Sequence, residues 1–184
     1  GEGIVMLQAL WRGRATRRAL ESDKALQRMR TRQNITKEIV ATELSYVQGL
    51  EMLVAFFSRP AQNFLTPNDV SVVFSNIETI LPCQAKFLED LRMGAQTKRI
   101  GQAFVDFAPN FEIYNTYVAN FEDSMAMIQK LKKKSEPFQD LLQAAVSPTG
   151  CGRNIEDLMI TPVQRIPRYR MLLDELRKNT VETH

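Results

Sequence analysis

Apolar residues recur three, four or seven positions apart along most of this chain, which is the spacing of one face of an α-helix. The pattern is clearest over residues 35–57. There one apolar stripe contains Ile35, Ile39, Tyr46, Leu50, Leu53 and Phe57. No window shows the sustained alternation expected of a half-buried strand. We therefore predict an all-α protein, an elongated helical bundle.

The first helical region is the longest, because no proline occurs between residues 4 and 58. It forms either one very long helix or two helices that meet near Asn34, a residue type that often caps a helix. We expect it to end where Arg59 and Pro60 break the pattern. Within 35–57 the side opposite the apolar stripe is small or polar, and a partner could lie flat against it. Its residues are Glu38, Thr42, Ser45 and Gly49.

Four further helical regions follow in the sequence. The first covers about 66–92, with Thr66 placed to cap its N-terminus. The others cover about 100–133, 137–146 and 154–179. Prolines inside these regions are expected to kink or disturb the helices, because a proline lacks the N–H that an interior turn needs. They are Pro82, Pro109, Pro162 and Pro167.

Charge is distributed unevenly along the chain. Residues 1–34 contain eight Lys or Arg and three acidic residues, whereas residues 35–184 contain sixteen basic and eighteen acidic residues. The front is therefore a basic arm on a nearly neutral body. A nucleic-acid-binding domain would need a basic face on the body as well, so we expect no nucleic-acid partner.

Conventional catalytic and metal-binding residues are sparse. The only histidine is His184, and the two cysteines, Cys83 and Cys151, stand alone. With no glycine-rich phosphate loop either, we expect no metal, no cofactor and no covalent chemistry. We find no stretch of roughly 18 apolar residues and so predict no membrane span. These features suggest a reducing, cytoplasmic location.

Two strings far apart in the sequence carry a family resemblance. Residues 38–50 read Glu-Ile-Val-Ala-Thr-Glu-Leu-Ser-Tyr-Val-Gln-Gly-Leu, and residues 158–173 read Leu-Met-Ile-Thr-Pro-Val-Gln-Arg-Ile-Pro-Arg-Tyr-Arg-Met-Leu-Leu. They resemble the first and third conserved regions of Dbl-homology domains. Residues 73–91 and 104–117 are similar to the helices between those regions. We therefore assign residues 34–184 to a Dbl-homology domain and residues 1–33 to a separate basic helix.

The resemblance implies a guanine-nucleotide exchange factor for a Rho-type small GTPase. Dbl-homology domains bind both switch regions of the GTPase and stabilise its nucleotide-free form, so that GDP leaves and GTP enters. The physical basis is linkage: a protein that prefers the empty GTPase weakens nucleotide binding by the same factor. The alternative is an interaction module that binds a GTPase or calmodulin without promoting exchange.

The resemblance also implies which residues bind the GTPase. They are Glu38, Thr42, Ser45, Thr161, Val163, Gln164, Arg165, Arg168 and Leu172. Glu38 matches a glutamate that hydrogen-bonds the first switch, although alone it would read as a solvated carboxylate. Val163 matches a selectivity position or is ordinary core. Arg165 and Arg168 fit structural ion pairs equally well. Thr161 replaces a lysine that many members carry, so that ionic contact is absent.

Members of this family continue past the position of His184. A long helix supplies further switch contacts, and a pleckstrin-homology domain usually follows. Neither is in this sequence. We interpret this as a boundary of the piece of chain, and we expect these residues alone to bind weakly and exchange poorly.

The front helix fits the IQ pattern bound by calmodulin and related EF-hand proteins. Its residues 7–20 read Leu-Gln-Ala-Leu-Trp-Arg-Gly-Arg-Ala-Thr-Arg-Arg-Ala-Leu. Apolar residues offer anchors and arginines attract an acidic partner. The predicted calmodulin-binding residues are Leu7, Gln8, Trp11, Arg12, Gly13, Arg17 and Leu20. Two other roles remain open: the helix lies on an anionic membrane surface, or it folds back on the exchange domain.

Overall fold

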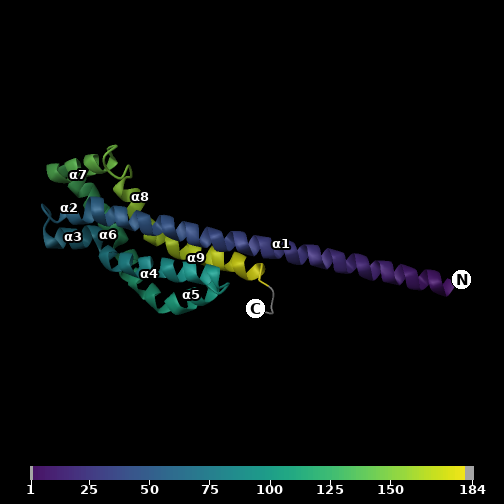
Figure 1. The fold of residues 1–184 in the computed structure, drawn as a ribbon. Coiled ribbons are helices and arrows are strands. Elements are labelled where there is room, and N and C mark those ends of the chain that lie inside the picture. The colour runs from purple at the N-terminus through teal and green to yellow at the C-terminus, as the bar shows by residue number, and fades with distance from the viewer. Residues whose placement is uncertain (1, 181–184) are drawn as a thin grey trace.

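The computed structural model describes the backbone of residues 2–180 and the side chains of residues 16–180, and the regular structure of this part is entirely helical (Figure 1). This confirms the all-α prediction. The elements are α1 (Glu2–Leu53), the π-helical turn η1 (Val54–Ser58), α2 (Arg59–Ala61), α3 (Pro67–Phe74), α4 (Ile77–Gln96), α5 (Ile100–Phe107), the 3-10 turn η2 (Ala108–Glu112), α6 (Ile113–Lys134), α7 (Glu136–Val146), α8 (Ile155–Met159) and α9 (Thr161–Lys178).

Helix α1 is one continuous helix, so the front arm and the bundle share an axis (Figure 1). Asn34 lies inside it and caps nothing. Residues 16–30 are all exposed, and Ile35 is the first buried residue among the described side chains of α1. The helical run ends at Ala61, one residue after the predicted break at Arg59-Pro60. The chain stays helical through η1 and α2, and the wider π-helical turn of η1 comes directly before Arg59 and Pro60.

The second helical region is two helices instead of one. Thr66 caps α3 as predicted, since its Oγ1 accepts a hydrogen bond from the backbone N–H of Asp69 at 3.1 Å. The chain then breaks at Ser75, which has a φ of 51°. Asn76 next to it donates from Nδ2 to the carbonyl of Ile113 at 2.7 Å, so a contact with α6 holds the break. Helix α4 runs on through Pro82.

Prolines also mark the later elements. Pro109 lies in η2, between α5 and α6, and α7 matches the predicted 137–146 helix. The predicted 154–179 helix is interrupted at Ile160, which separates α8 from α9. Pro162 then stands in the first turn of α9, where proline fits well, and Pro167 lies inside that helix.

The apolar face of α1 contributes to two buried clusters among the described residues. Leu50, with Phe57 of the adjoining η1, joins a cluster near the C-terminal end of α1, while Ile39 joins one that includes Phe87 and Tyr169. Burying a side chain of this size contributes about 1.5–3 kcal/mol. Both clusters therefore fix α1 firmly against α4 and α9, and this fixes the face that α1 leaves exposed.

By length and composition alone, the helical stretch Thr16–Ala61 would be long and apolar enough to cross a membrane. This differs from the prediction of no such stretch. A helix whose apolar face is buried in a protein core passes the same test, and Ile39, Leu50 and Leu53 are completely buried. Their burial explains the apolar character of the stretch.

Candidate functional site

Helices α1 and α9 lie side by side and run in opposite directions (Figure 1). Three contacts show the direction, because the position on α9 falls as the position on α1 rises. Arg32 bonds Thr180, Glu38 pairs with Arg168, and Glu43 pairs with Arg165. The two strings of the sequence, more than a hundred residues apart, are thereby brought onto adjacent helices.

Glu38 and Arg168 connect the exposed sides of these two helices. Their Oε1 and Nη2 atoms are 3.0 Å apart, and the side chains are 50% and 48% exposed. An ion pair this open to solvent is weak, in the range of about 0–1 kcal/mol. Both groups thus lie at the surface in a geometry that a partner can rearrange.

The neighbouring polar positions extend this surface on both helices. On α1, Ser45 is exposed and Thr42 is half-buried. On α9, Gln164 is exposed, while Thr161 is half-buried and donates its hydroxyl to the carbonyl of Leu158 at 2.7 Å. We call the surface formed by Glu38, Thr42, Ser45, Thr161, Gln164 and Arg168 the α1–α9 face.

Gly49, which the sequence places in line with this face, packs elsewhere. A Cβ built there would lie 3.6 Å from Leu158 Cδ2, so α8 covers this side of α1. The α1–α9 face therefore does not reach Gly49.

Three predicted contact residues lie beneath the surface. Arg165 and Leu172 are only 5% and 7% exposed, and Val163 is partly buried against the apolar core. Arg165 and Leu172 therefore do not present their side chains at the surface of the free protein. The stripe Arg165, Tyr169, Leu172 and Leu176 faces inward, because residues three and four apart share one side of a helix.

Arg165 is held by a completely buried carboxylate. Its Nη2 donates to Glu43 Oε2 at 2.6 Å, and the hydroxyl of Tyr169 donates to the same oxygen at 2.7 Å. The guanidinium also lies over the Tyr169 ring, 4.5 Å from the centroid. A weaker contact at 3.4 Å reaches the hydroxyl of Thr42 in the α1–α9 face. The buried pair thus touches the exposed face from below.

Polar contacts extend from this pair to two more helices. Tyr169 OH lies 3.2 Å from Gln84 Oε1 on α4, and Gln84 Nε2 donates to Tyr114 OH on α6 at 2.6 Å. The hydroxyls of Tyr114 and Tyr46 are 2.9 Å apart. We call these residues the buried polar network. It joins α1, α4, α6 and α9 through hydrogen bonds, in addition to the apolar contacts of the two clusters.

The network is not fully satisfied among the described residues. Glu43 Oε1 and Arg165 Nε are buried without a hydrogen-bond partner. Burial raises the pKa of the Glu43 carboxyl above its ordinary value of 4.5, and Arg165 and Tyr169 offset only part of that effect. Arginine stays charged, because its pKa lies far above neutral pH. Burying these charged groups is therefore unfavourable, and the short ion pair and hydrogen bonds of the network must offset the lost hydration.

Sequence reasoning missed Glu43, Tyr46, Gln84 and Tyr114 as parts of the site. A signal existed for Glu43, which falls on the apolar stripe between Ile39 and Tyr46. A carboxylate on a buried face requires a partner. Nothing in the sequence pointed to Gln84, since its role depends on tertiary packing.

The predicted calmodulin-binding residues are only partly within the described side chains. Leu7, Gln8, Trp11, Arg12 and Gly13 lie on the backbone of α1, but their side chains fall outside the described residues. Arg17 and Leu20 are exposed, Leu20 by 55%. Both residues lie on α1, the same unbroken helix that carries Glu38.

A family model identifies this domain. The RhoGEF domain model matches residues 35–184, which is most of the chain. The chain therefore belongs to the RhoGEF (Dbl-homology) domain family. The matched region begins at the residue where burial of α1 begins.

Curated relatives agree with the family. The chain is 32% identical over 187 residues to guanine exchange factor for Rac 30 of Dictyostelium discoideum, covering 99% of this chain and 11% of that protein. It is 30% identical over 150 residues to the human proto-oncogene vav, covering 79% of this chain and 18% of that protein. The chain thus spans only about a tenth to a fifth of the length of these relatives.

The fold matches solved structures as well. A structure of Vav1 with an allosteric inhibitor that blocks its GEF activity superposes with a TM-score of 0.80 at 29% identity, covering 85% of this chain and 29% of that one. The DH and PH domains of PDZ-RhoGEF, solved in complex with activated RhoA, give a TM-score of 0.75 at 23% identity, over 86% of this chain and 48% of that one. This second match concerns the fold alone.

Proposed function

We propose that this protein is a guanine-nucleotide exchange factor that acts on a Rho-type small GTPase through the α1–α9 face. Family membership supports the class of activity, and the relatives named for exchange on Rac or for GEF activity support it further. The observation that carries the proposal is the Glu38–Arg168 pair. It places both family-matched charges on one exposed surface.

The proposed mechanism is an exchange of partners at Glu38. In the free protein Arg168 accompanies the Glu38 carboxylate, and the pair contributes little stability because it is half-exposed. The first switch of the GTPase takes over the Glu38 carboxylate, and Gln164 and Arg168 become available to the second switch. Contacts made only with the nucleotide-free GTPase lower its affinity for GDP by the same factor.

The buried polar network has a supporting part in this mechanism. It sets how far α9 lies along α1, and so it sets the spacing between Glu38 on one helix and Arg168 on the other. A binding surface works best when the elements that carry it are held rigidly. Arg165 thus acts through position and not by contact with the GTPase.

The direct test is release of a fluorescent GDP analogue from a panel of Rho-family GTPases. We expect this chain, or a version extended beyond His184, to accelerate release from at least one member. If both leave every member unchanged while binding one of them, the protein is instead the non-catalytic interaction module.

We also propose that an EF-hand protein such as calmodulin binds the front helix and alters exchange. The supporting observation is the unbroken α1, which continues from the IQ pattern into the residues around Glu38, with Arg17 and Leu20 exposed on the way. A protein bound to the arm would lie close to the α1–α9 face. We expect calcium–calmodulin to change the rate of GDP release. Equal rates with and without it, under conditions of confirmed binding, would contradict regulation but not exchange.

A further inference from the structure

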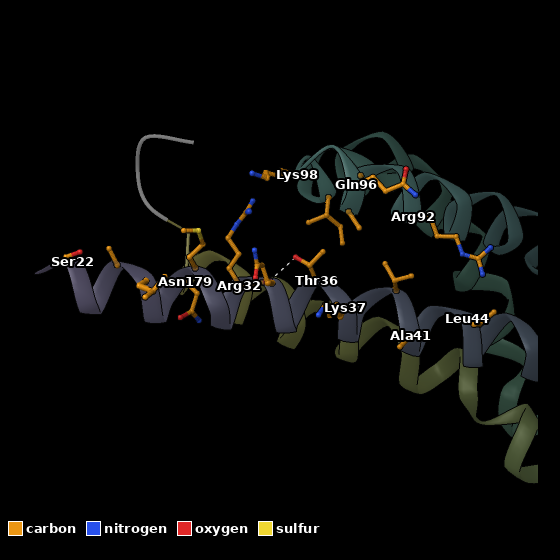
Figure 2. A pocket seen from close by; sticks show the side chains of 18 residues that line it. Ser22, Arg32, Thr36, Lys37, Ala41, Leu44, Arg92, Gln96, Lys98 and Asn179 are labelled. Atoms are coloured by element: carbon orange, nitrogen blue, oxygen red, sulfur yellow. Dashed lines mark hydrogen bonds between the residues drawn. The ribbon is translucent and has the colours of Figure 1, made fainter. Parts of the chain in front are cut away.

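A second concave surface lies on another side of α1. A groove of about 1110 Å³ runs between residues 22–44 of α1 and the C-terminal end of α4 with the turn that follows it (Figure 2). Asn179 lines its outer end. The volume slightly exceeds the usual upper range of small-molecule pockets, about 1,000 Å³. An elongated groove of this size fits a segment of protein better.

The α1 wall of the groove has the spacing of a coiled-coil seam. Its residues lie alternately four and three positions apart, an average of 3.6 between Ser22 and Val40, and this alternation is the pattern of positions through which two helices pack side by side. They are Ser22, Leu26, Met29, Gln33, Thr36 and Val40. Leu26 is 46% exposed and Met29 is 54% exposed, so the apolar part of the seam is uncovered. The spacing favours a helix as the occupant.

The charges around the groove have one sign. Among the described residues that line it are four cations and no carboxylate; the cations are Arg32, Lys37, Arg92 and Lys98. Arg92 is paired with Glu89, and Arg32 bonds Thr180. Lys37 and Lys98 face the groove from its two walls, and Figure 2 shows Lys98 across from Arg32 and Thr36.

The backbone holds Lys98 in place. Lys98 has a φ of 62°, and the next residue, Arg99, donates its N–H to the carbonyl of Gly94 at 2.7 Å. Gly94 is required at this end of α4, since a Cβ there would lie 2.9 Å from the Cα of Ile100. The turn is therefore tight, and the cation projects from a rigid wall.

We propose that this groove binds an acidic amphipathic helix of a partner protein. The seam, which is apolar at Leu26, Met29 and Val40, would take the partner's own three-four repeat. Glutamates beside that repeat would pair with Lys37 and Lys98, as flanking charges do in coiled coils. A second copy of this chain suits the site poorly, because residues 1–34 carry a large excess of positive charge. A flat membrane surface suits a recessed groove poorly.

The centre of the groove and the α1–α9 face lie on different sides of α1. Successive residues of an α-helix are about 100° apart, which puts Val40 about 200° around α1 from Glu38. The proposal therefore does not depend on exchange activity, and each can fail without the other.

The test uses a labelled synthetic peptide of about three heptads, with leucine at the seam positions and glutamate elsewhere, and a second peptide with lysine in place of glutamate. Fluorescence anisotropy should show that the chain binds the acidic peptide and not the basic one. Leu26→Glu should weaken binding by about tenfold or more, and Val118→Glu should not. Val118 is the matched control, because it is equally exposed, at 46%, and lies on α6.

A charge-reversal variant separates loss of binding from loss of folding, because a folded variant should gain binding to the basic peptide. The double variant Lys37→Glu, Lys98→Glu should lose the acidic peptide and gain the basic one. Acidic-peptide binding that survives both Leu26→Glu and the double variant, or that is absent from the wild-type chain, would overturn the proposal. So would a Leu26-dependent binding to phosphatidylserine vesicles or a Leu26-dependent self-association in place of peptide binding.

Discussion

Glu38 of α1 and Arg168 of α9 form a half-exposed ion pair 3.0 Å long, the upper pair, and a second ion pair between the same helices, the lower pair, is buried. The lower pair, Glu43–Arg165, is 2.6 Å long and almost inaccessible to water. Two Glu–Arg pairs between the same antiparallel helices therefore have different roles. The lower pair joins the helices, and the upper pair is available to a partner.

Arg168→Ala tests the part of the upper pair that α9 supplies. We expect the free energy of unfolding to change by less than about 1 kcal/mol, because exposed ion pairs contribute little. GDP release from the responsive GTPase should fall clearly, because Arg168 belongs to the α1–α9 face. Arg170→Ala is the control, since Arg170 is exposed on another side of α9. Equal effects of the two variants on release would contradict the assignment.

Arg165→Met tests the lower pair. Removing one partner leaves a buried charge alone, so denaturant unfolding should show a loss of about 3–5 kcal/mol. The double variant Arg165→Met, Glu43→Leu should lose less than the sum of the two single variants, because the charges disappear together. Additive losses would show that the two side chains do not act as a pair.

The raised pKa of Glu43 predicts a pH dependence of stability. In the unfolded chain Glu43 loses its proton near its ordinary pKa of 4.5, whereas in the folded protein it keeps the proton to higher pH. Between these two values the folded state binds more protons, so the free energy of unfolding must fall as pH rises. Glu43→Gln removes this titration. The stability of wild type relative to Glu43→Gln should therefore decrease as pH rises above 4.5. A difference that stays constant or grows over that window would contradict the raised pKa.

Helical periodicity was a reliable guide wherever side-chain burial follows a simple stripe. Ile39, Leu50 and Phe57 were placed in the core from spacing alone, and each is completely buried. The break at Ile160 had a signal in Pro162, which fits the first turn of a new helix, whereas the break at Ser75 has no glycine or proline to mark it. At Ser75 a hydrogen bond from Asn76 to the distant Ile113 holds the conformation.

The candidate site was predictable in part for a similar reason. Glu38 lies opposite the apolar stripe, so its exposure follows from the sequence. For Arg165 the sequence leaves a GTPase contact and a structural ion pair equally open, because an arginine is usually exposed unless it is paired. Its burial depends on a carboxylate 122 positions away in the sequence. A pattern within one helix cannot show that partner.

The central claim, that Glu38 drives nucleotide exchange, is tested most directly by GDP release with Glu38→Ala beside a matched control. Glu51→Ala removes another exposed carboxylate of the same helix, one that lies away from the α1–α9 face. With the GTPase that responds to the wild-type chain, we expect Glu38→Ala to abolish the acceleration and Glu51→Ala to preserve it, with unchanged helical content in both. Full acceleration by Glu38→Ala would contradict the account.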